Sequence, residues 1–364
     1  MASPLVHLFV GSINRKADSL VPGQGITVLT FDEDTLALET VCVADDIDNP
    51  TFLALDPVNE QIYAASEVET WFEGTVSAYA FDRATGTLTY LNKQPTLGRT
   101  TCHVTVTGDG HVAIANYSHG EGGPDQAMAL YRIEPDGRLS SALASIAHKG
   151  PTGPRSDRQE RSHPHSVQQT PDGRFLIVAD LGTDEVVAYR HESGRLMRSS
   201  AYSATPGAGP RHFTFHPGGK LIYVMNEIIP SVSVLAFDGQ NFELLQELST
   251  VPDDYSGQSW GADIHLSPDG RHLYASTRVH DAIALFEVGS DGLLTRRGII
   301  ASGGKWPRSF TITPSGRHVL VANHNSDNIV VFARDGETGT LTPTGREIAI
   351  GTPMRVEAVM FDAI

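Results

Sequence analysis

The stretch TPDGRFLIVADLGTDEVVAYR, residues 170–190, contains two apolar runs bounded by short turns rich in Gly, Asp and Pro. Runs of this length with such turns are typical of β-strands. Close relatives of the stretch recur as HPGGKLIYVMNEIIPSVSVLAF (216–237), SPDGRHLYASTRVHDAIALFEV (267–288) and TPSGRHVLVANHNSDNIVVFAR (313–334). Weaker copies begin at Asp56 and Thr107. The chain is therefore a tandem repeat of a β unit.

The turn proline marks the period of the repeat. It stands at Pro57, Pro171, Pro217, Pro268 and Pro314, and Gly108 takes its place in the second copy. Consecutive markers are 51, 63, 46, 51 and 46 residues apart. Each interval contains three clear strands and a weaker fourth, such as FELLQELST (242–250) or LLTRRGIIAS (293–302), which leaves no room for a long helix. Four strands in about 40–50 residues is the signature of a β-propeller blade.

The two ends of the chain supply one more blade. The C-terminal VEAVMFDAI (356–364) matches a first strand, and the N-terminal HLFVGSIN (7–14) matches a second strand that lacks its own first. We therefore predict an all-β fold with seven four-stranded antiparallel blades. Strands from both termini share one blade and close the ring, which removes the exposed sheet edges that a linear array would leave. Residues 1–364 are expected to form a single domain.

Composition narrows the function. The formal net charge of −16 argues against a nucleic-acid-binding protein, which needs a basic face. No apolar run approaches the roughly 18 residues of a membrane helix, and the N-terminus lacks a secretory signal pattern, so we expect a soluble, cytoplasmic protein. Cys42 and Cys102 indicate neither a disulfide framework nor a zinc site. The oligomeric state is left open.

In a repeat protein, residues that differ at equivalent positions are the better functional candidates. Asp184, Asp281 and Asp327 each follow their turn proline by thirteen residues, so we interpret them as structural residues that bond to backbone amides. Two other positions vary in chemistry. Six residues before the turn proline stand Thr51, Cys102, His165, Arg211, Ala262 and Arg308; ten residues after it stand Glu67, Leu181, Glu227, Arg278 and His324, with Tyr117 or Ser118 in the shorter copy.

These two positions should lie opposite each other on an antiparallel hairpin, at the end away from the turn. Every blade would then present both at one mouth of the central channel. The cations gathered there favour a small anionic ligand. His163 lies one step outside this register. The excess segment KGPTGPRSDRQERSHPHS (149–166) precedes His165, and its Arg155, Arg158 and Arg161 either reach over the channel or are solvated.

The segments quoted above, together with GPRSDRQERSHPHS (153–166) and GAGPRHFTFHPGGKLIYVMNE (207–227), resemble the seven-bladed lactonase family. That family includes bacterial propeller-type 6-phosphogluconolactonases and the fungal 3-carboxy-cis,cis-muconate lactonizing enzyme. The resemblance implies a catalytic set made of His165, Arg211, Glu227 and Arg278. It extends over nearly the whole chain and is strongest from about Gly150 to Arg334.

The resemblance implies hydrolysis of a sugar-acid lactone, with 6-phosphoglucono-δ-lactone as the leading substrate. Either His165 or Glu227 would be the base that activates water, and Arg211 with Arg278 would hold anionic oxygens. The expected substrate-binding residues are Arg308, His324, His163, Glu67, Arg155, Arg158 and Arg161. We expect no cofactor and no metal. The alternatives are reversible lactonization of a carboxylated muconate and a propeller that only binds partners.

Overall fold

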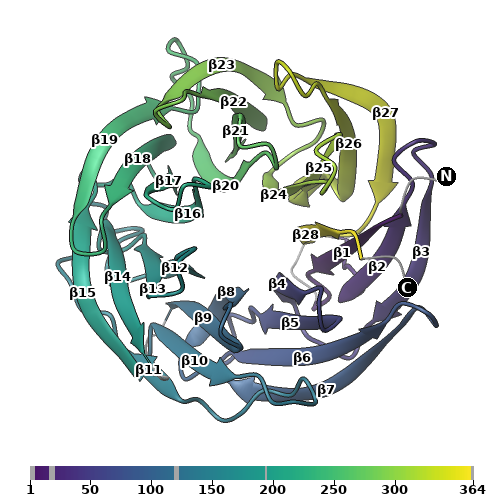
Figure 1. The fold of residues 1–364 in the computed structure, drawn as a ribbon, viewed down its shortest axis with the longest axis horizontal. Helices are drawn as coiled ribbons and strands as arrows, with labels where there is room; N and C mark the ends of the chain where they lie inside the picture. Colours follow the sequence, from purple (N-terminus) through teal and green to yellow (C-terminus); the bar gives the residue numbers. More distant parts are fainter. Residues whose placement is uncertain (1–4, 16–20, 119–122, 193–194, 362–364) are drawn as a thin grey trace.

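A computed structural model describes residues 5–15, 21–118, 123–192 and 195–361. Its strands form seven four-stranded antiparallel sheets arranged as a ring, as predicted (Figure 1). Among these residues, the helical structure is a single 3-10 turn, η1 (His324–Ser326). None of the described helical structure is long and apolar enough to cross a bilayer.

The strands occupy four concentric layers. The innermost strands are β28 (Pro353–Val359), β4 (Pro50–Asp56), β8 (Arg99–Val106), β12 (Pro164–Gln169), β16 (Pro210–Phe215), β20 (Trp260–Leu266) and β24 (Pro307–Ile312). The second layer consists of β1 (Val6–Ser12), β5 (Gln61–Ser66), β9 (His111–Ser118), β13 (Phe175–Asp180), β17 (Leu221–Asn226), β21 (His272–Arg278) and β25 (His318–Asn323). The third consists of β2 (Ile26–Phe31), β6 (Thr75–Asp82), β10 (Met128–Arg132), β14 (Glu185–Glu192), β18 (Ser231–Phe237), β22 (Ala282–Val288) and β26 (Asn328–Arg334). The outer strands are β3 (Leu38–Ala44), β7 (Thr87–Pro95), β11 (Ala144–Ile146), β15 (Arg195–Ser203), β19 (Phe242–Ser249), β23 (Leu294–Ala301) and β27 (Leu341–Ala349).

The core lies between neighbouring blades. The second and third strands are apolar and buried on both faces; β13, for example, is buried along its whole length. The outer strands alternate between exposed and partly buried residues, as β15 does, because only their inner face meets another blade. Each blade must therefore pack against two neighbours, which the ring provides.

The ring closes as the sequence predicted. β28 from the C-terminus pairs with β1 from the N-terminus, with Val10 opposite Val356, and β1 continues into β2 and β3. In Figure 1 the yellow β28 therefore lies beside the purple β1. The first and last segments of the chain thus share one blade.

A bulge recurs in every inner strand. Pro210 pairs with Asn226, but the next pair is His212 with Met225, so Arg211 is an extra residue on the inner strand. Equivalent register shifts occur in the other six inner strands. The prediction that Arg211 lies directly opposite Glu227 is wrong for two reasons. Near the turn Phe215 pairs with Ile222, a register that would already place Arg211 opposite Asn226, and the bulge then gives that place to Pro210. Both residues nevertheless lie at the same end of the hairpin, where the Glu227 N–H donates to the Gly209 carbonyl.

The repeated aspartates connect consecutive blades. Asp184 accepts hydrogen bonds from the backbone N–H groups of Gly207 and Gly209, at 2.7 and 2.8 Å. Asp281 accepts one from Trp306 and Asp327 one from Thr352, each at 2.8 Å. In each case the acceptor holds the segment that leads into the next inner strand. This confirms the structural interpretation of the three residues.

We predict that Asp327→Ala destabilises the closure of the ring. Asp327 has φ of +52°, which alanine adopts poorly, and the substitution also removes the acceptor for Thr352. The free energy of unfolding should fall by about 1–3 kcal/mol, measured by urea denaturation. Asp327→Asn tolerates this backbone conformation and keeps an acceptor oxygen, so it should retain most of the stability. Equal losses in the two variants would contradict this role.

Candidate active site

Glu227 is the centre of a buried charge cluster at the mouth of the channel. It follows β17 directly and is 3% exposed. Its carboxylate lies 2.8 Å from Nε of Arg211 and 2.9 Å from Nη2 of Arg278, and it also pairs with Arg158. Burial alone would raise the pKa of Glu227, but Arg278, Arg211 and Arg158 together hold it far below its usual range. The carboxylate is therefore ionised at neutral pH.

Arg211 and Arg278 are held by backbone carbonyls as well as by Glu227. Nη1 of Arg211 donates to the Ala262 carbonyl, and Nη2 of Arg278 donates to the Gly261 carbonyl, both at 2.6 Å. Both carbonyls belong to β20, next to its bulge. The two guanidinium groups are therefore fixed before any ligand arrives, as a preorganised anion site requires.

His165 occupies the bulge of β12 and is 5% exposed. Its Nε2 lies 3.9 Å from Oε2 of Glu227, and its ring meets Tyr117 and His212 edge-on. Nδ1 has no hydrogen-bond partner among the residues that the structure describes. Burial, followed by the charge of Arg211, lowers the pKa of His165 well below its ordinary value. His165 is therefore neutral and has a nitrogen available as a proton acceptor.

The long segment before β12 contributes Arg158 to this cluster. Arg158 contacts Glu227 and the Tyr117 hydroxyl, and its guanidinium lies over the ring of Trp260. The other candidates of this segment have different surroundings. Arg155 is exposed and pairs with Asp157, and Arg161 pairs with Glu160 at 3.6 Å.

His163 is enclosed by local contacts. Its Nδ1 lies 2.6 Å from the Tyr117 carbonyl oxygen and its Nε2 3.1 Å from Glu160, and its ring stacks on Tyr117. These contacts favour a packing role, although His163 directly precedes the proline that leads to His165.

The remaining candidates line a cavity of about 690 Å³ at the same mouth. Arg308 lies 3.6 Å from Glu67, and one oxygen of Glu67 has no hydrogen-bond partner among the described residues. His324, in η1, also lines the cavity, and burial lowers its pKa to about 4. Arg15 and Glu69 also line the cavity, so together with the Glu227 cluster the described part of the mouth holds five guanidinium groups against three carboxylates. This excess of positive charge suits an anionic ligand.

Trp306 is a mouth residue that the sequence analysis missed. It lines the cavity, and the guanidinium of Arg278 lies 5.4 Å from its ring centre. Its backbone has φ of +63° and is held by Asp281. Trp306 immediately precedes the repeated proline at Pro307, a position that the sequence comparison did not follow.

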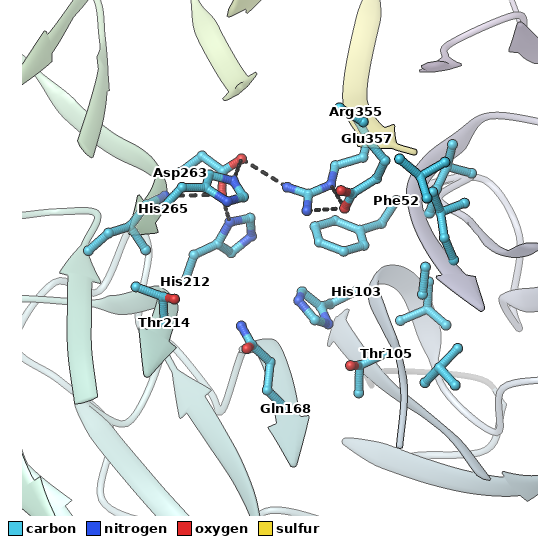
Figure 2. A pocket seen from close by; sticks show the side chains of 18 of the residues that line it. Phe52, His103, Thr105, Gln168, His212, Thr214, Asp263, His265, Arg355 and Glu357 are labelled. Atoms are coloured by element: carbon cyan, nitrogen blue, oxygen red, sulfur yellow. Dashed lines mark hydrogen bonds and ion pairs between the residues drawn. The ribbon is translucent and has the colours of Figure 1, made fainter. Parts of the chain in front are cut away.

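The other end of the channel has a cavity of about 380 Å³ with a different charge balance. Figure 2 shows Phe52, His103, His212 and other residues of several blades around it, with Arg355 joined to both Asp263 and Glu357. Its two carboxylates therefore compensate the Arg355 guanidinium. The electrostatic attraction for an anion is therefore weaker here than at the mouth.

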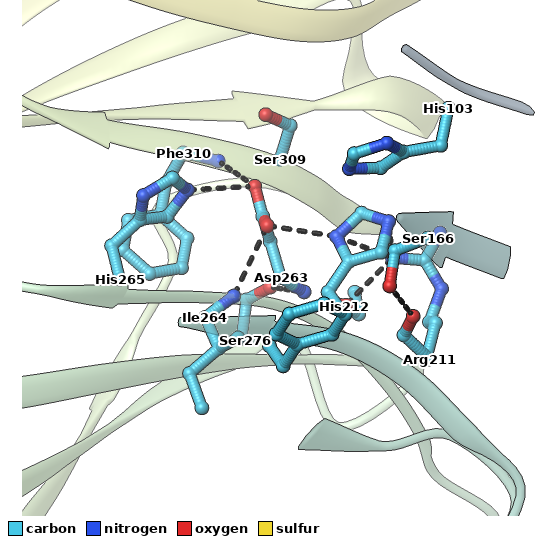
Figure 3. Close-up of polar contacts among 12 residues, drawn as sticks. His103, Ser166, Arg211, His212, Asp263, Ile264, His265, Ser276, Ser309 and Phe310 are labelled. Carbon is cyan, nitrogen blue, oxygen red and sulfur yellow. Dashed lines mark hydrogen bonds and ion pairs between the residues drawn. The ribbon is translucent and has the colours of Figure 1, made fainter. Parts of the chain in front are cut away.

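A network of polar residues lines the cavity at this other end of the channel, and sequence reasoning missed it too. Asp263 accepts hydrogen bonds from His212 (2.9 Å) and His265 (3.1 Å) (Figure 3). It also accepts one from Arg355 (2.9 Å), which Figure 2 shows. Burial would raise the pKa of Asp263, but His265 and Arg355 hold it well below the usual range. The sequence does contain a pattern that could have identified these residues. His212, Asp263 and Arg355 each stand two residues after the site of the repeated proline, one position beyond the one that was compared between blades.

The donor set at the mouth does not resemble a metal site. Both carboxylate oxygens of Glu227 already bind guanidinium groups, and the charged side chains in contact with it are cations. A metal ion would have to displace these pairs and would be repelled by the arginines. The arrangement is suited to holding anionic oxygens near the His165 ring.

Comparisons with known proteins agree with this geometry. Residues 7–358 match the family described as Lactonase, 7-bladed beta-propeller. The chain is 35% identical over 338 residues to the 6-phosphogluconolactonase of Bacillus subtilis, covering 92% of this chain and 94% of that one. It is 32% identical over 355 residues to the 6-phosphogluconolactonase of Formosa agariphila, covering 94% and 96%. Its fold is similar to that of the periplasmic gluconolactonase of Pseudomonas aeruginosa, with a TM-score of 0.89, 29% identity, and coverage of 98% and 99%.

We predict that Glu227→Gln makes stability less sensitive to acid. Because the folded-state pKa of Glu227 is depressed, its charge stabilises the fold above the unfolded pKa, and this contribution is lost as pH falls below about 4.5. The free energy of unfolding of the wild type should therefore exceed that of the variant at neutral pH, and the difference should shrink in acid. Denaturant titrations at several pH values measure it.

The matched control for this prediction is Glu243→Gln, which changes an exposed carboxylate on β19. It should differ little from the wild type across the same pH range, since exposed charges contribute little. A wild-type advantage over Glu227→Gln that stays constant down to acid pH would show that Glu227 is not held ionised by its arginines.

Proposed function

The chain belongs to the seven-bladed β-propeller lactonase family, and we propose that it hydrolyses 6-phosphoglucono-δ-lactone to 6-phosphogluconate at the channel mouth. The observation that carries the proposal is the preorganised cluster of Arg158, Arg211 and Arg278 around Glu227, beside a neutral His165. The names of two relatives at 32–35% identity support the same substrate. Hydrolysis of this lactone makes a carboxylate in a molecule that already carries a phosphate.

Opening the lactone requires a base for water and a site for negative charge on the carbonyl oxygen. His165 is the base in this proposal, because Nδ1 is without a partner among the described residues and the ring is neutral. Glu227 is less suited to that role, because its charge is engaged by arginines. Instead, Glu227 faces Nε2 of His165 at 3.9 Å, where it can stabilise the imidazolium that forms.

The arginines have two roles in this scheme. Arg211 and Arg278 hold the developing oxyanion and then the product carboxylate, since a guanidinium stays charged and offers paired donors. Arg308 and His324, on the wall of the mouth cavity, hold the phosphate. An anion bound there would offset the charges of Arg211 and Arg308 that depress the pKa of His165, so His165 becomes a stronger base in the complex.

The substrate is tested by the pseudo-first-order loss of freshly prepared 6-phosphoglucono-δ-lactone, with and without protein. We expect acceleration over the spontaneous rate, and a loss of about 10²–10⁴-fold in kcat for His165→Asn. The matched control is His216→Asn, in the β16–β17 turn at the other end of the hairpin, which should turn over like the wild type. Lack of acceleration by the wild type would exclude this substrate, and a carboxylated muconate would be tested next.

The pH dependence tests the base. Because the pKa of His165 is lowered in the free enzyme, the ring stays deprotonated as pH falls through the ordinary histidine range. We therefore predict that kcat/KM holds constant from neutral pH to well below about 6.5, the ordinary pKa of histidine. The assignment of His165 as the base would be contradicted if kcat/KM changed near pH 6.5 and if this change disappeared on substitution of a different histidine.

The phosphate contact is tested with two substrates. For Arg308→Ala, KM for 6-phosphoglucono-δ-lactone should rise by about tenfold or more, while KM for unphosphorylated glucono-δ-lactone changes little, because a charge-assisted contact to phosphate is lost. Arg155→Ala, at an exposed residue paired with Asp157, is the matched control. Equal effects of Arg308→Ala on both substrates would assign Arg308 to the lactone itself.

A single domain over residues 1–364 and a cytoplasmic location stay predictions from the sequence. Since a structurally similar gluconolactonase of Pseudomonas aeruginosa is described as periplasmic, the location is tested by fractionating the source cells.

A further inference from the structure

Asp109, His111 and His191 meet at a boundary between two blades, on the face of the ring away from the channel mouth. Asp109 lies in the turn between β8 and β9, and His111 is the first residue of β9. His191 comes from β14 of the next blade, where its N–H donates to the Arg174 carbonyl. Residues 80 or more positions apart in the sequence thus face one another, because consecutive blades are neighbours in the ring.

The donor atoms lie close enough together for a metal site. Nδ1 of His111 lies 3.2 Å from Oδ1 of Asp109, and Nδ1 of His191 lies 3.3 Å from Oδ2 of the same carboxylate. One donor atom from each residue can be chosen so that all lie within 4.8 Å of one another. Bonds of about 2.0–2.1 Å in a tetrahedral zinc site put neighbouring ligand atoms about 3.4 Å apart.

The ring nitrogens at this boundary are not satisfied by hydrogen bonds. His191 is 7% exposed, and neither of its ring nitrogens has a hydrogen-bond partner within the described part of the chain. Nδ1 of His111 is also buried without a hydrogen-bond partner among the described residues. Its approach to Asp109 is close enough for an ion pair, but it lacks hydrogen-bond geometry. A buried polar atom without a partner is unfavourable, so binding of an additional group at this position would stabilise the fold.

The boundary between the blades β20–β23 and β24–β27 has the equivalent positions occupied by residues other than histidine. Asp269 is the turn residue equivalent to Asp109, and Arg334 is equivalent to His191, because its N–H donates to the Arg317 carbonyl. There, the Arg334 guanidinium donates to Asp269 at 2.9 Å. The residue equivalent to His111 is Arg271.

Two positions that carry guanidinium groups at that boundary therefore carry imidazoles at this one. A guanidinium brings its own positive charge to the carboxylate and cannot act as a ligand. A neutral imidazole has a free electron pair and brings no positive charge to the carboxylate of Asp109, which accepts hydrogen bonds from the neutral side chains of Thr107 and Gln169.

We propose that Asp109, His111 and His191 bind one divalent transition-metal ion, with Zn²⁺ as the best chemical match, and that the ion links the blade β8–β11 to the blade β12–β15. Two imidazoles and one carboxylate suit zinc better than calcium or magnesium, which prefer oxygen ligands. Water would complete a four-coordinate site. The site lies away from the channel mouth, so the ion is structural and takes no part in the proposed hydrolysis.

The test is metal binding by the full-length protein after chelator treatment, with Co²⁺ as a spectroscopic probe and Zn²⁺ as a competitor. We expect one Co²⁺ per chain, with the intense visible absorption of a tetrahedral ion, displacement by Zn²⁺, and a higher Tm with Zn²⁺ bound. Asp109→Asn and His191→Arg should each weaken binding by about tenfold or more. His191→Arg introduces the residue used with Asp269, so it preserves the pairing of the blades.

Asp172→Asn is the matched control, because Asp172 is the equivalent turn residue of the next blade and pairs with Arg174. It should bind Co²⁺ like the wild type. Lack of binding at metal concentrations up to about 1 mM, which corresponds to a standard binding free energy weaker than about −4 kcal/mol, would overturn the proposal. Unchanged affinity in folded Asp109→Asn and His191→Arg would overturn it as well, since the ion would then be bound elsewhere.

Discussion

Every inner strand carries one extra residue at the same place, and the chemistry of the channel depends on this repeated bulge. A regular strand would alternate its side chains between the two faces of the blade. The bulge interrupts that alternation beside the repeated proline and brings successive residues such as Arg211 and His212 into the channel. Bulges re-aim side chains in this way at many functional sites. The proline, the bulge and the aspartate contacts between blades together make a rigid frame whose side chains vary from blade to blade.

The variation gives the two ends of the channel different electrostatics. At the mouth, Glu227 forms ion pairs with three arginines. Arg308 and Glu67 form a longer pair, at 3.6 Å, on the wall of the cavity. At the other end, Arg355 is compensated by Asp263 and Glu357. Between them, Arg211 contacts both Glu227 and the His212 ring, so the two ends are connected by direct contacts. An anion therefore gains most at the mouth, although the net charge of the protein is −16.

The number of blades, the fourth strands and the shared terminal blade could all be predicted, because turn chemistry and apolar periodicity repeat in the sequence. The same alignment selected His165, Arg211, Glu227 and Arg278, which the structure brings together at one mouth. The register of the hairpin could not be predicted in this way, since neither the pairing set at the turn nor the extra residue of the bulge changes the apolar pattern.

Residues outside the repeated pattern were harder to place. The contact of Arg158 with Glu227 depends on the path of a segment that occurs in one blade only. Trp306 stands beside the repeated proline and outside the two positions that were compared. His191 pairs with Asp109 where another blade boundary has Arg334 with Asp269, so the apolar pattern does not distinguish the two boundaries. The most direct test of the account is a crystal structure with 6-phosphogluconate bound. We predict its carboxylate on Arg211 and Arg278 beside His165, with its phosphate on Arg308. Binding in the cavity around Asp263 and Arg355, at the opposite end, would contradict the account.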